Sequence, residues 1–360
     1  MKAAVFREPG IEMEIEEVSI GTPGPREVLV RTAAAGLCHS DLHQIDGHYA
    51  SPRPTILGHE AAGVVEAVGS EVTRFKKGDH VISCLSVFCG HCGHCVSGRP
   101  YACESGEMIR PEGAPPRLLK GTETIHQFYH LSAFAEMMLV HEHALVRIDP
   151  AMPLDKAALI GCAVVTGVGS VIHTARIEVG STVAVIGCGG IGLSAINGAH
   201  LAGAGRIIAI DVVPEKLELA RRVGATDVVN ARNTNPVEAV REMTRGGVDY
   251  AIEAIGRVET IEQAFEMTGR SGTAVVIGMV SKEAKISITA NDLLGDKRLV
   301  GSRMGSNRFI ADMPRYVDFY LDGRLKLDHL LARHIALEEI NAGMTDLRSG
   351  TQARSVIIFA

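Results

Sequence analysis

The 360-residue chain lacks several features that mark particular classes of protein. It has no strong excess of either charge, since 36 Lys and Arg stand against 42 Asp and Glu. This balance gives no reason to expect nucleic acid or a membrane as a partner. We find no charge-free apolar stretch of about 20 residues and expect no transmembrane helix. The opening MKAAVFREPG breaks its apolar run at Arg7, unlike a secretory signal, so we expect a cytoplasmic protein. Tryptophan is also absent, which excludes nothing by itself.

The pattern of apolar residues divides the chain into two kinds of structure. Residues 1–160 carry short β-like runs such as EVLVRT and AEMMLVHE, separated by Gly, Pro and Asp. From about residue 164, compact apolar runs such as TVAVIG and RIIAID alternate with helical stretches such as EKLELARRVG. This alternation predicts a parallel α/β sheet that is buried on both faces. After about residue 300 the pattern is mixed again.

The α/β part contains a dinucleotide-binding signature. TVAVIGCGGIG places Gly187, Gly189 and Gly192 at G-x-G-x-x-G spacing, directly after an expected strand and before an expected helix. Asp211 lies 19 residues beyond Gly192, where an acidic residue hydrogen-bonds the ribose 2′-hydroxyl and repels a 2′-phosphate. We therefore favour NAD over NADP. Asp211 also suits a helix N-cap, and Lys216 either reaches the ribose or is a solvated helix charge.

Four cysteines lie close together at C-x2-C-x2-C-x7-C spacing: Cys89, Cys92, Cys95 and Cys103. This spacing fits a closed, tetrahedral structural zinc site. Disulfides are rare inside cells, and a thioredoxin-type pair needs its own βαβ context, so both alternatives are less suitable. His91 and His94 leave a Cys3His variant open. A nucleic-acid-binding zinc ribbon would need a basic surface.

An open metal site needs other residues. Cys38, His39, His59, Glu60 and Cys162 are candidates, and two thiolates with one imidazole would leave a fourth position for water or substrate. Each also has an ordinary interpretation, because Cys162 suits a small core residue and His59 suits a turn. Spacing alone does not join these positions.

The motifs GLCHSDLH, GHEAAGVVEAVG, the four-cysteine cluster, GCAVVTG and GCGGIG occur in this order. Together they resemble the zinc-dependent medium-chain alcohol dehydrogenases, over essentially the whole chain. The resemblance implies a GroES-like β-rich catalytic domain over 1–163 and 304–360, around a Rossmann NAD-binding domain over 164–303. It implies two Zn²⁺ per chain, one catalytic and one structural. It also implies a homodimer, with a homotetramer as the alternative.

The resemblance assigns roles residue by residue. Cys38, His59 and Cys162 would hold the catalytic zinc beside Glu60. Asp41 would orient His59, and Ser40 would pass the alcohol proton towards His43. His39 stands where the liver-type enzymes have an arginine. The implied cofactor contacts are Gly187, Gly189, Gly190, Ile191, Gly192, Asp211, Lys216, His39, Thr166 and Arg354.

The implied reaction is reversible hydride transfer between an alcohol and NAD⁺, which gives an aldehyde or ketone. Four residues would form an apolar wall suited to a bulky primary or secondary alcohol, although core packing explains each equally: Leu85, Tyr49, Phe128 and Met279. Tyr129 is undecided. A glutathione-dependent formaldehyde dehydrogenase is disfavoured by the acidic Glu107 and by Tyr49. A nicotinoprotein, a zinc-free reductase and a non-catalytic NAD-binding protein are further alternatives.

Overall fold

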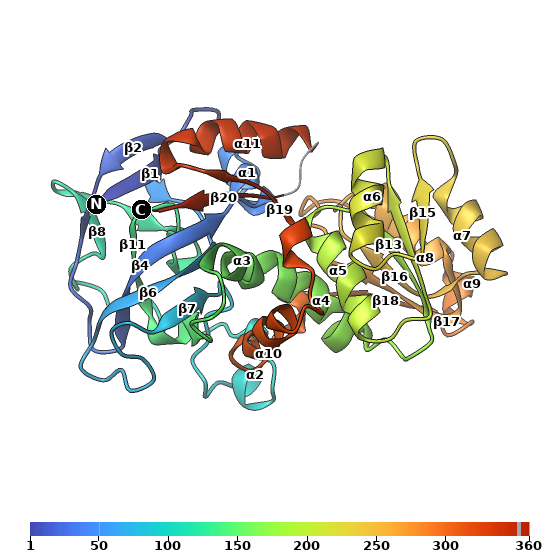
Figure 1. Ribbon diagram of the computed structural model, residues 1–360, viewed down its shortest axis with the longest axis horizontal. Coiled ribbons are helices and arrows are strands. Elements are labelled where there is room, and N and C mark those ends of the chain that lie inside the picture. The colour runs from blue at the N-terminus through green and yellow to red at the C-terminus, as the bar shows by residue number, and fades with distance from the viewer. Residues whose placement is uncertain (50, 351–353, 360) are drawn as a thin grey trace. The chain divides into compact units, whose positions relative to one another are not determined.

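The structure is a computed structural model that describes residues 1–49, 51–350 and 354–359. The chain forms two compact units, shown in Figure 1. Unit 1 comprises Met1–Cys162, Arg308–Asp322 and Leu331–Ala360, and unit 2 comprises Ala163–Asn307 and Gly323–Leu330. The sequence-based boundaries place residues 163, 304–307 and 323–330 in the catalytic domain, whereas these residues belong to unit 2.

Unit 1 is rich in β-structure. Its strands are β1 Lys2–Phe6, β2 Glu14–Glu17, β3 Ser19–Ile20, β4 Glu27–Gly36, β5 Thr55–Ile56, β6 Glu60–Val68, β7 His80–Ser83, β8 Leu118–Lys120, β9 Glu123–Thr124, β10 His126–Gln127, β11 Met137–His141, β12 Leu145–Arg147, β19 Leu331–Ile335 and β20 Arg354–Ile358. Its helices are α1 His39–Ile45, α2 Gly93–Val96, α3 Leu154–Leu159, α10 Phe309–Leu321 and α11 Ile340–Ser349. Short 3-10 turns cover Pro100–Ala102, Phe128–His130, Glu142–Ala144 and Leu337–Glu339.

The long strand β4 organises the main sheet of unit 1. In the described residues this sheet has the order β12-β7-β6-β4-β20-β19, and β11 pairs with β4. Strand β4 is antiparallel to β6, with Gly36 opposite Glu60, and antiparallel to β20, with Gly36 opposite Val356. The end of β4, the start of β6 and the start of β20 therefore meet at one edge of the sheet. Two smaller sheets have the orders β10-β5-β1-β2 and β3-β8-β9.

Unit 2 is a doubly wound parallel sheet. Its strands are β13 Thr182–Ile186, β14 Arg206–Asp211, β15 Asp227–Asn230, β16 Val248–Glu253, β17 Thr268–Val276 and β18 Arg298–Gly301. Its helices are α4 Val165–Gly169, α5 Gly190–Leu201, α6 Pro214–Arg222, α7 Pro236–Thr244, α8 Val258–Glu266 and α9 Ala290–Leu293, with 3-10 turns at Met304–Ser306 and Leu327–His329.

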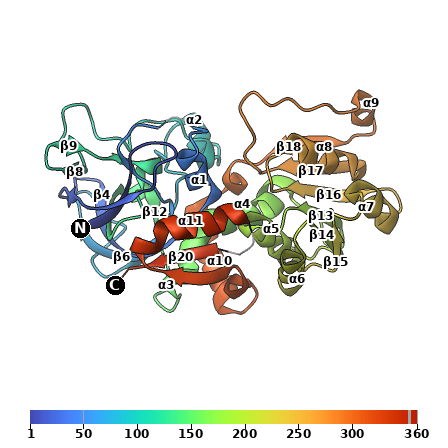
Figure 2. The same ribbon diagram turned by 90° about the horizontal axis from the view of Figure 1, so that it is seen from above.

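The strand order in unit 2 is β15-β14-β13-β16-β17-β18, and every adjacent pair is parallel. Helix α5 contacts α6, and α7 contacts α8, so helices layer the sheet (Figure 2). The compact, β-branched strands that the sequence predicts are buried between these layers, as both-face burial requires. The order reverses next to β13, which places a switch point at the end of that strand.

One helical run is longer and more apolar than the sequence led us to expect. Leu154–Ala175, which includes π-helical turns at Ile160–Val164 and Ser170–Ala175, has 22 residues, and the mean hydropathy of its most apolar 18-residue window is 1.7. By length and composition it could cross a membrane, although we expected no such stretch from the sequence. However, 83% of its most apolar window is buried inside the protein, as in the core helix of a globular domain.

Candidate metal centres and cofactor site

The first candidate metal centre lies at the edge of the unit 1 sheet where β4, β6 and β20 meet. Cys38 follows the end of β4, and His59 directly precedes β6. Cys162 lies in the π-helical turn that continues α3, and α3 packs on β4 and β6. The three residues and Glu60 each offer one ligand atom, and these four atoms all lie within 4.8 Å of one another. All four residues are buried.

Asp41 links Cys38 to the segment that carries His59. One carboxylate oxygen, Oδ2, accepts a hydrogen bond from the Cys38 N–H at 3.1 Å, which caps helix α1. The other, Oδ1, accepts from the Gly58 N–H at 3.1 Å. Oδ1 also lies 3.3 Å from Nδ1 of His59, an electrostatic contact without hydrogen-bond geometry. Nε2 of His59 is buried and has no hydrogen-bond partner in the described residues. A buried, unpartnered ring nitrogen beside two thiols fits a metal ligand.

The electrostatics suit a cation at this centre. A hydrogen bond from Cys162 lowers the pKa of the Cys38 thiol well below its usual value, and the same bond raises the pKa of Cys162. Burial alone would lower the pKa of His59, but the Asp41 and Cys38 charges outweigh it and raise that pKa. Burial raises the pKa of Glu60 to about 8, although Arg354 opposes this effect. Sulfur, nitrogen and oxygen donors of this kind favour zinc.

Arg354 contacts Glu60, one of the four residues of this centre. Its side chain is buried, its Nη1 is 3.2 Å from Oε1 of Glu60, and it donates a hydrogen bond to the Leu37 carbonyl oxygen. Burial alone would lower the pKa of Arg354, but the Glu60 charge and a hydrogen bond with Cys38 raise it, so its guanidinium lies among the residues of this centre. The pyrophosphate contact remains a prediction.

The second candidate centre is formed by the sulfurs of Cys89, Cys92, Cys95 and Cys103, which all lie within 4.8 Å of one another. The Cys92 and Cys95 sulfurs are 3.5 Å apart, and the Cys89–Cys95 and Cys92–Cys103 sulfurs are 3.9 Å apart. A zinc tetrahedron with bonds of about 2.3 Å has S···S edges of about 3.8 Å. The four sulfurs therefore fit a closed zinc site without a histidine, and none of them is in a disulfide. Of the two nearby histidines, His91 contacts Glu107 at 2.7 Å.

Two aromatic rings lie against the first centre. The His59 ring has edge contacts with Phe128 at 5.7 Å and with Tyr129 at 5.6 Å between centroids. Burial and the nearby Cys162 charge raise the pKa of Tyr129 to about 12. The sequence leaves Tyr129 undecided, and it offers no signal for this contact because the ring is turned by a left-handed backbone with φ of 49°.

Helix α1 carries Ser40 and His43, the two residues for which the resemblance implies a role in proton transfer. Ser40 and His43 are one turn apart on α1, and the oxygen of Ser40 lies 3.8 Å from the Cys38 sulfur. Nδ1 of His43 lies 3.2 Å from Nδ1 of the exposed His48, which the sequence analysis does not include. Tyr49 packs edge-on against the His43 ring at 5.9 Å. Burial and the neighbouring His48 lower the pKa of His43.

The glycine motif in unit 2 has the form of a phosphate-binding turn. Gly192 is needed for close packing, because a Cβ at this position would lie 1.7 Å from the Gly187 carbonyl oxygen. Gly189 is the N-cap of α5, and a Cβ there would meet no atom within 4 Å. The backbone at Gly189 is therefore open at a helix N-terminus, where a pyrophosphate binds.

Asp211 at the end of β14 lies next to this turn. Its carboxylate accepts hydrogen bonds from the backbone N–H groups of Cys188 at 2.7 Å, Val212 at 2.7 Å and Val213 at 3.0 Å. It also lines a cavity of about 340 Å³ at the carboxyl ends of the strands. The cavity lies at the expected switch point, but the sequence did not predict its other lining residues. These are Ile186, Ile210, Val212, Ala231, Ile255, Arg257, Glu259, Thr260 and Gln263.

The remaining predicted residues are less informative. Leu85 is half-buried against the core of unit 1, and Met279 in unit 2 is 40% exposed. Thr166 is buried, and its hydroxyl donates to the sulfur of Met304 at 3.5 Å. His39 and Gly190 open helices α1 and α5, Ile191 is on α5, and Lys216 is on α6. A hollow of about 720 Å³ between residues 19–27 and 107–117 contains none of the predicted site residues.

Comparison with known proteins agrees with this description. Residues 24–150 match the alcohol dehydrogenase GroES-like domain, and residues 190–322 match the zinc-binding dehydrogenase family. An alcohol dehydrogenase zinc-binding domain protein from Burkholderia ambifaria is 36% identical with a TM-score of 0.95, over 100% of this chain and 98% of that one. Benzyl alcohol dehydrogenase from Acinetobacter calcoaceticus is 34% identical with a TM-score of 0.94, over 100% and 99%.

A putative zinc-binding dehydrogenase from Sinorhizobium meliloti 1021, bound to NADP, is 28% identical with a TM-score of 0.85, over 99% of both chains. The fold, the two-part family match and these identities define a zinc-binding dehydrogenase. The chain belongs to the zinc-binding alcohol dehydrogenases of the medium-chain dehydrogenase/reductase family. The family and the fold class predicted from the sequence are thereby confirmed.

Proposed function

We propose that this protein is a zinc- and NAD-dependent alcohol dehydrogenase that oxidises an apolar, aromatic alcohol to its aldehyde or ketone. The observation that carries the proposal is the buried group of Cys38, His59, Glu60 and Cys162, whose ligand atoms lie within 4.8 Å of one another beside two aromatic rings. Leu85, Tyr49 and Met279 stay predicted members of the substrate wall.

Cys38, His59 and Cys162 would hold the catalytic zinc, and the four-cysteine group would hold a structural one. When bound, zinc supplies the Lewis acid that lowers the pKa of an alcohol hydroxyl, and NAD⁺ supplies the hydride acceptor. Asp41 would keep the His59 ring oriented through its contact with Nδ1. The carboxylate of Glu60, which contacts Arg354, lies beside the three ligands and could replace one of them during ligand exchange.

The alcohol loses one hydride and one proton, and the proton must leave the buried site. Ser40, whose oxygen is 3.8 Å from the Cys38 sulfur, would accept this proton, and His43 lies one helical turn further on. Because His43 is 3.2 Å from His48, which is exposed, the pair offers an exit to solvent. His43 accepts a proton reversibly, and the lowering of its pKa by burial favours rapid release.

Asp211 supports NAD rather than NADP as the cofactor, because its carboxylate would repel a 2′-phosphate. A putative zinc-binding dehydrogenase at 28% identity is bound to NADP, and the ratio of kcat/KM for NAD⁺ and NADP⁺ would test the choice. Gly187, Gly189, Gly190, Ile191 and Gly192 would bind the pyrophosphate.

The choice of an aromatic alcohol rests on the two rings against His59 and on the benzyl alcohol dehydrogenase neighbour. We expect the enzyme to act in the cytoplasm as a homodimer, and size-exclusion chromatography with light scattering would test the oligomeric state.

Zinc content and alcohol oxidation would test the proposal together. Wild type should contain about two zinc ions per chain, and Cys38→Ser should contain about one and lose NAD⁺-dependent oxidation of benzyl alcohol. Cys84→Ala is the matched control, because Cys84 is buried in the same unit but belongs to neither sulfur group. One zinc per chain in wild type, or full activity in Cys38→Ser, would overturn the proposal.

A further inference from the structure

Phe128 and Tyr129, whose rings lie beside His59, belong to a turn with an unusual backbone. Tyr129, His130 and Ser132 have φ angles of 49°, 63° and 65°, and none of them is glycine. Such left-handed residues are uncommon outside glycine, and three in four positions persist only where the surroundings hold them. The position of the Phe128 and Tyr129 rings therefore depends on what fixes this turn.

Backbone hydrogen bonds hold the two flanks of the turn to the segment that leads to His59. The His126 N–H donates to Pro54 O at 2.8 Å, and the Ala133 N–H donates to Gly58 O at 3.0 Å. Between these flanks the side chain of Gln127 bridges the turn. Its Nε2 donates to the carbonyl oxygens of Leu131 at 3.4 Å and Leu139 at 3.1 Å.

Arg117 fixes the orientation of the Gln127 amide. Nη1 of Arg117 donates to Oε1 of Gln127 at 2.8 Å, so the NH2 end of the amide must face the turn. If the amide were reversed, its oxygen would face the carbonyl oxygens of Leu131 and Leu139, and both hydrogen bonds would be lost. The guanidinium thus determines which end of Gln127 meets the turn.

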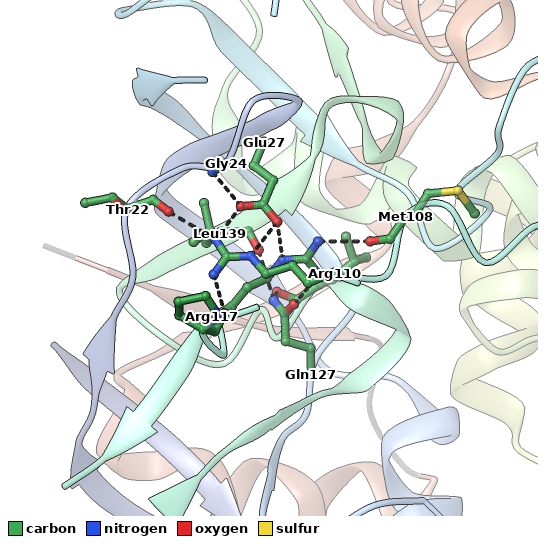
Figure 3. Close-up of polar contacts among 10 residues, drawn as sticks. Thr22, Gly24, Glu27, Met108, Arg110, Arg117, Gln127 and Leu139 are labelled. Atoms are coloured by element: carbon green, nitrogen blue, oxygen red, sulfur yellow. Dashed lines mark hydrogen bonds and ion pairs between the residues drawn. The ribbon is translucent and has the colours of Figure 1, made fainter. Parts of the chain in front are cut away.

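A buried carboxylate in turn fixes Arg117, as Figure 3 shows. Nε of Arg117 donates to Oε1 of Glu27 at 2.7 Å, and Nη2 donates to Met108 O at 2.9 Å. Glu27 also accepts from Gly24 N at 2.8 Å and from Nε of Arg110 at 3.0 Å. The side chains of Arg117 and Glu27 are only 9% and 7% exposed, so water competes little for these bonds.

We infer that Arg117 and Gln127 are positioning residues that set the Phe128 and Tyr129 rings beside the metal centre and thereby set the preference for aromatic over small alcohols. The inference rests on the proposed function for its effect on substrates. The network runs from Glu27 on β4 through Arg117 and Gln127 to the turn. Arg110 binds the same carboxylate but reaches Thr22 O and Pro115 O instead of Gln127.

Arg117→Met and Arg110→Met form a matched pair, because each leaves Glu27 with one guanidinium and only Arg117→Met frees the Gln127 amide. For each variant, kcat and KM would be measured with benzyl alcohol and with ethanol, together with zinc content. We expect Arg117→Met to lower the benzyl alcohol to ethanol ratio of kcat/KM about tenfold, mainly through KM for benzyl alcohol. Arg110→Met should keep the wild-type ratio. Equal changes in both variants, or an unchanged ratio in Arg117→Met, would overturn the inference.

A fluorescence reporter tests the positioning without any activity. The chain has no tryptophan, so Tyr129→Trp introduces a single one on the turn. Adding Arg117→Met should shift its emission to longer wavelength and increase its quenching by acrylamide, whereas adding Arg110→Met should not. Gln127→Met provides a second way to break the bridge if Arg117→Met does not fold. An inactive wild type whose reporter responds as expected would refute the proposed function but support the positioning role. An unresponsive reporter would refute the positioning role.

Discussion

Replacing Gly189 with alanine should weaken cofactor binding without destabilising the fold. The backbone of Gly189 has φ of −80° and ψ of −172°, an extended conformation that alanine adopts without strain. The added Cβ would meet no protein atom within 4 Å, so we expect a stability change within about 0.5 kcal/mol. The methyl group would instead occupy the open space at the N-terminus of α5, where the pyrophosphate approaches the backbone.

The size of the effect follows from that geometry. A methyl group that displaces the pyrophosphate from the α5 N–H groups should raise the Kd for NADH by ten- to a hundredfold, or about 1.4 to 2.8 kcal/mol. Gly192→Ala is the contrasting change. There the Cβ would lie 1.7 Å from the Gly187 carbonyl oxygen, so the backbone must shift by more than an ångström to reach even the 3.0 Å limit. We expect the free energy of unfolding to fall by about 1–3 kcal/mol.

NADH binding would be measured by fluorescence titration and stability by chemical unfolding of the cofactor-free protein. Gly189→Ala should lose binding and keep its unfolding midpoint, and Gly192→Ala should lose stability. Wild-type affinity in Gly189→Ala would refute the assignment of this turn to the pyrophosphate. A lower unfolding midpoint in Gly189→Ala would refute the claim that the space is open.

Three further outcomes follow from named contacts. Asp211→Ala should raise kcat/KM for NADP⁺ relative to NAD⁺ by about tenfold or more, since a repelling charge is removed; an unchanged ratio in steady-state assays would contradict the ribose assignment. Cys92→Ser should reduce zinc from about two ions per chain to about one and lower the thermal unfolding temperature, as measured by metal analysis and calorimetry; retention of both ions would contradict the closed site. Burial alone would raise the pKa of Glu27, but hydrogen bonds from Arg110 and the Gly24 N–H, with the charge of Arg117, outweigh burial and lower this pKa from its ordinary 4.5 to about 2. The ionised Glu27 carboxylate should therefore contribute about 3 kcal/mol to stability above pH 4.5, and this contribution should disappear as the pH falls to 2. In urea unfolding, Glu27→Gln should be less stable than wild type at neutral pH, and its free energy of unfolding should change less between pH 4.5 and 2. Parallel pH curves for the two proteins would contradict the assignment.

The sequence by itself determined the features whose parts are close together in the chain. The glycine motif, the strand before it and Asp211 form one βαβ unit, so local spacing was enough to predict this arrangement of strand, turn and helix in unit 2. The four cysteines between residues 89 and 103 lie within fifteen positions, and their sulfurs converge as predicted. The alternation of apolar strands with helical stretches likewise predicted the parallel sheet, because the periodicity of apolar residues in each element can be read from neighbouring positions in the sequence.

Tertiary structure alone decided the features whose parts are far apart. Cys38, His59 and Cys162 converge because antiparallel pairing puts Gly36 opposite Glu60 and because α3 packs on the same strands. Resemblance suggested this set, but spacing did not. The antiparallel pairing of β20 with β4 likewise brings Arg354, from near the C-terminus, to Glu60. Burial decided the nature of the helical run Leu154–Ala175, and the left-handed turn decided the place of Tyr129. These features depend on long-range register and packing, to which no local pattern of residue types corresponds.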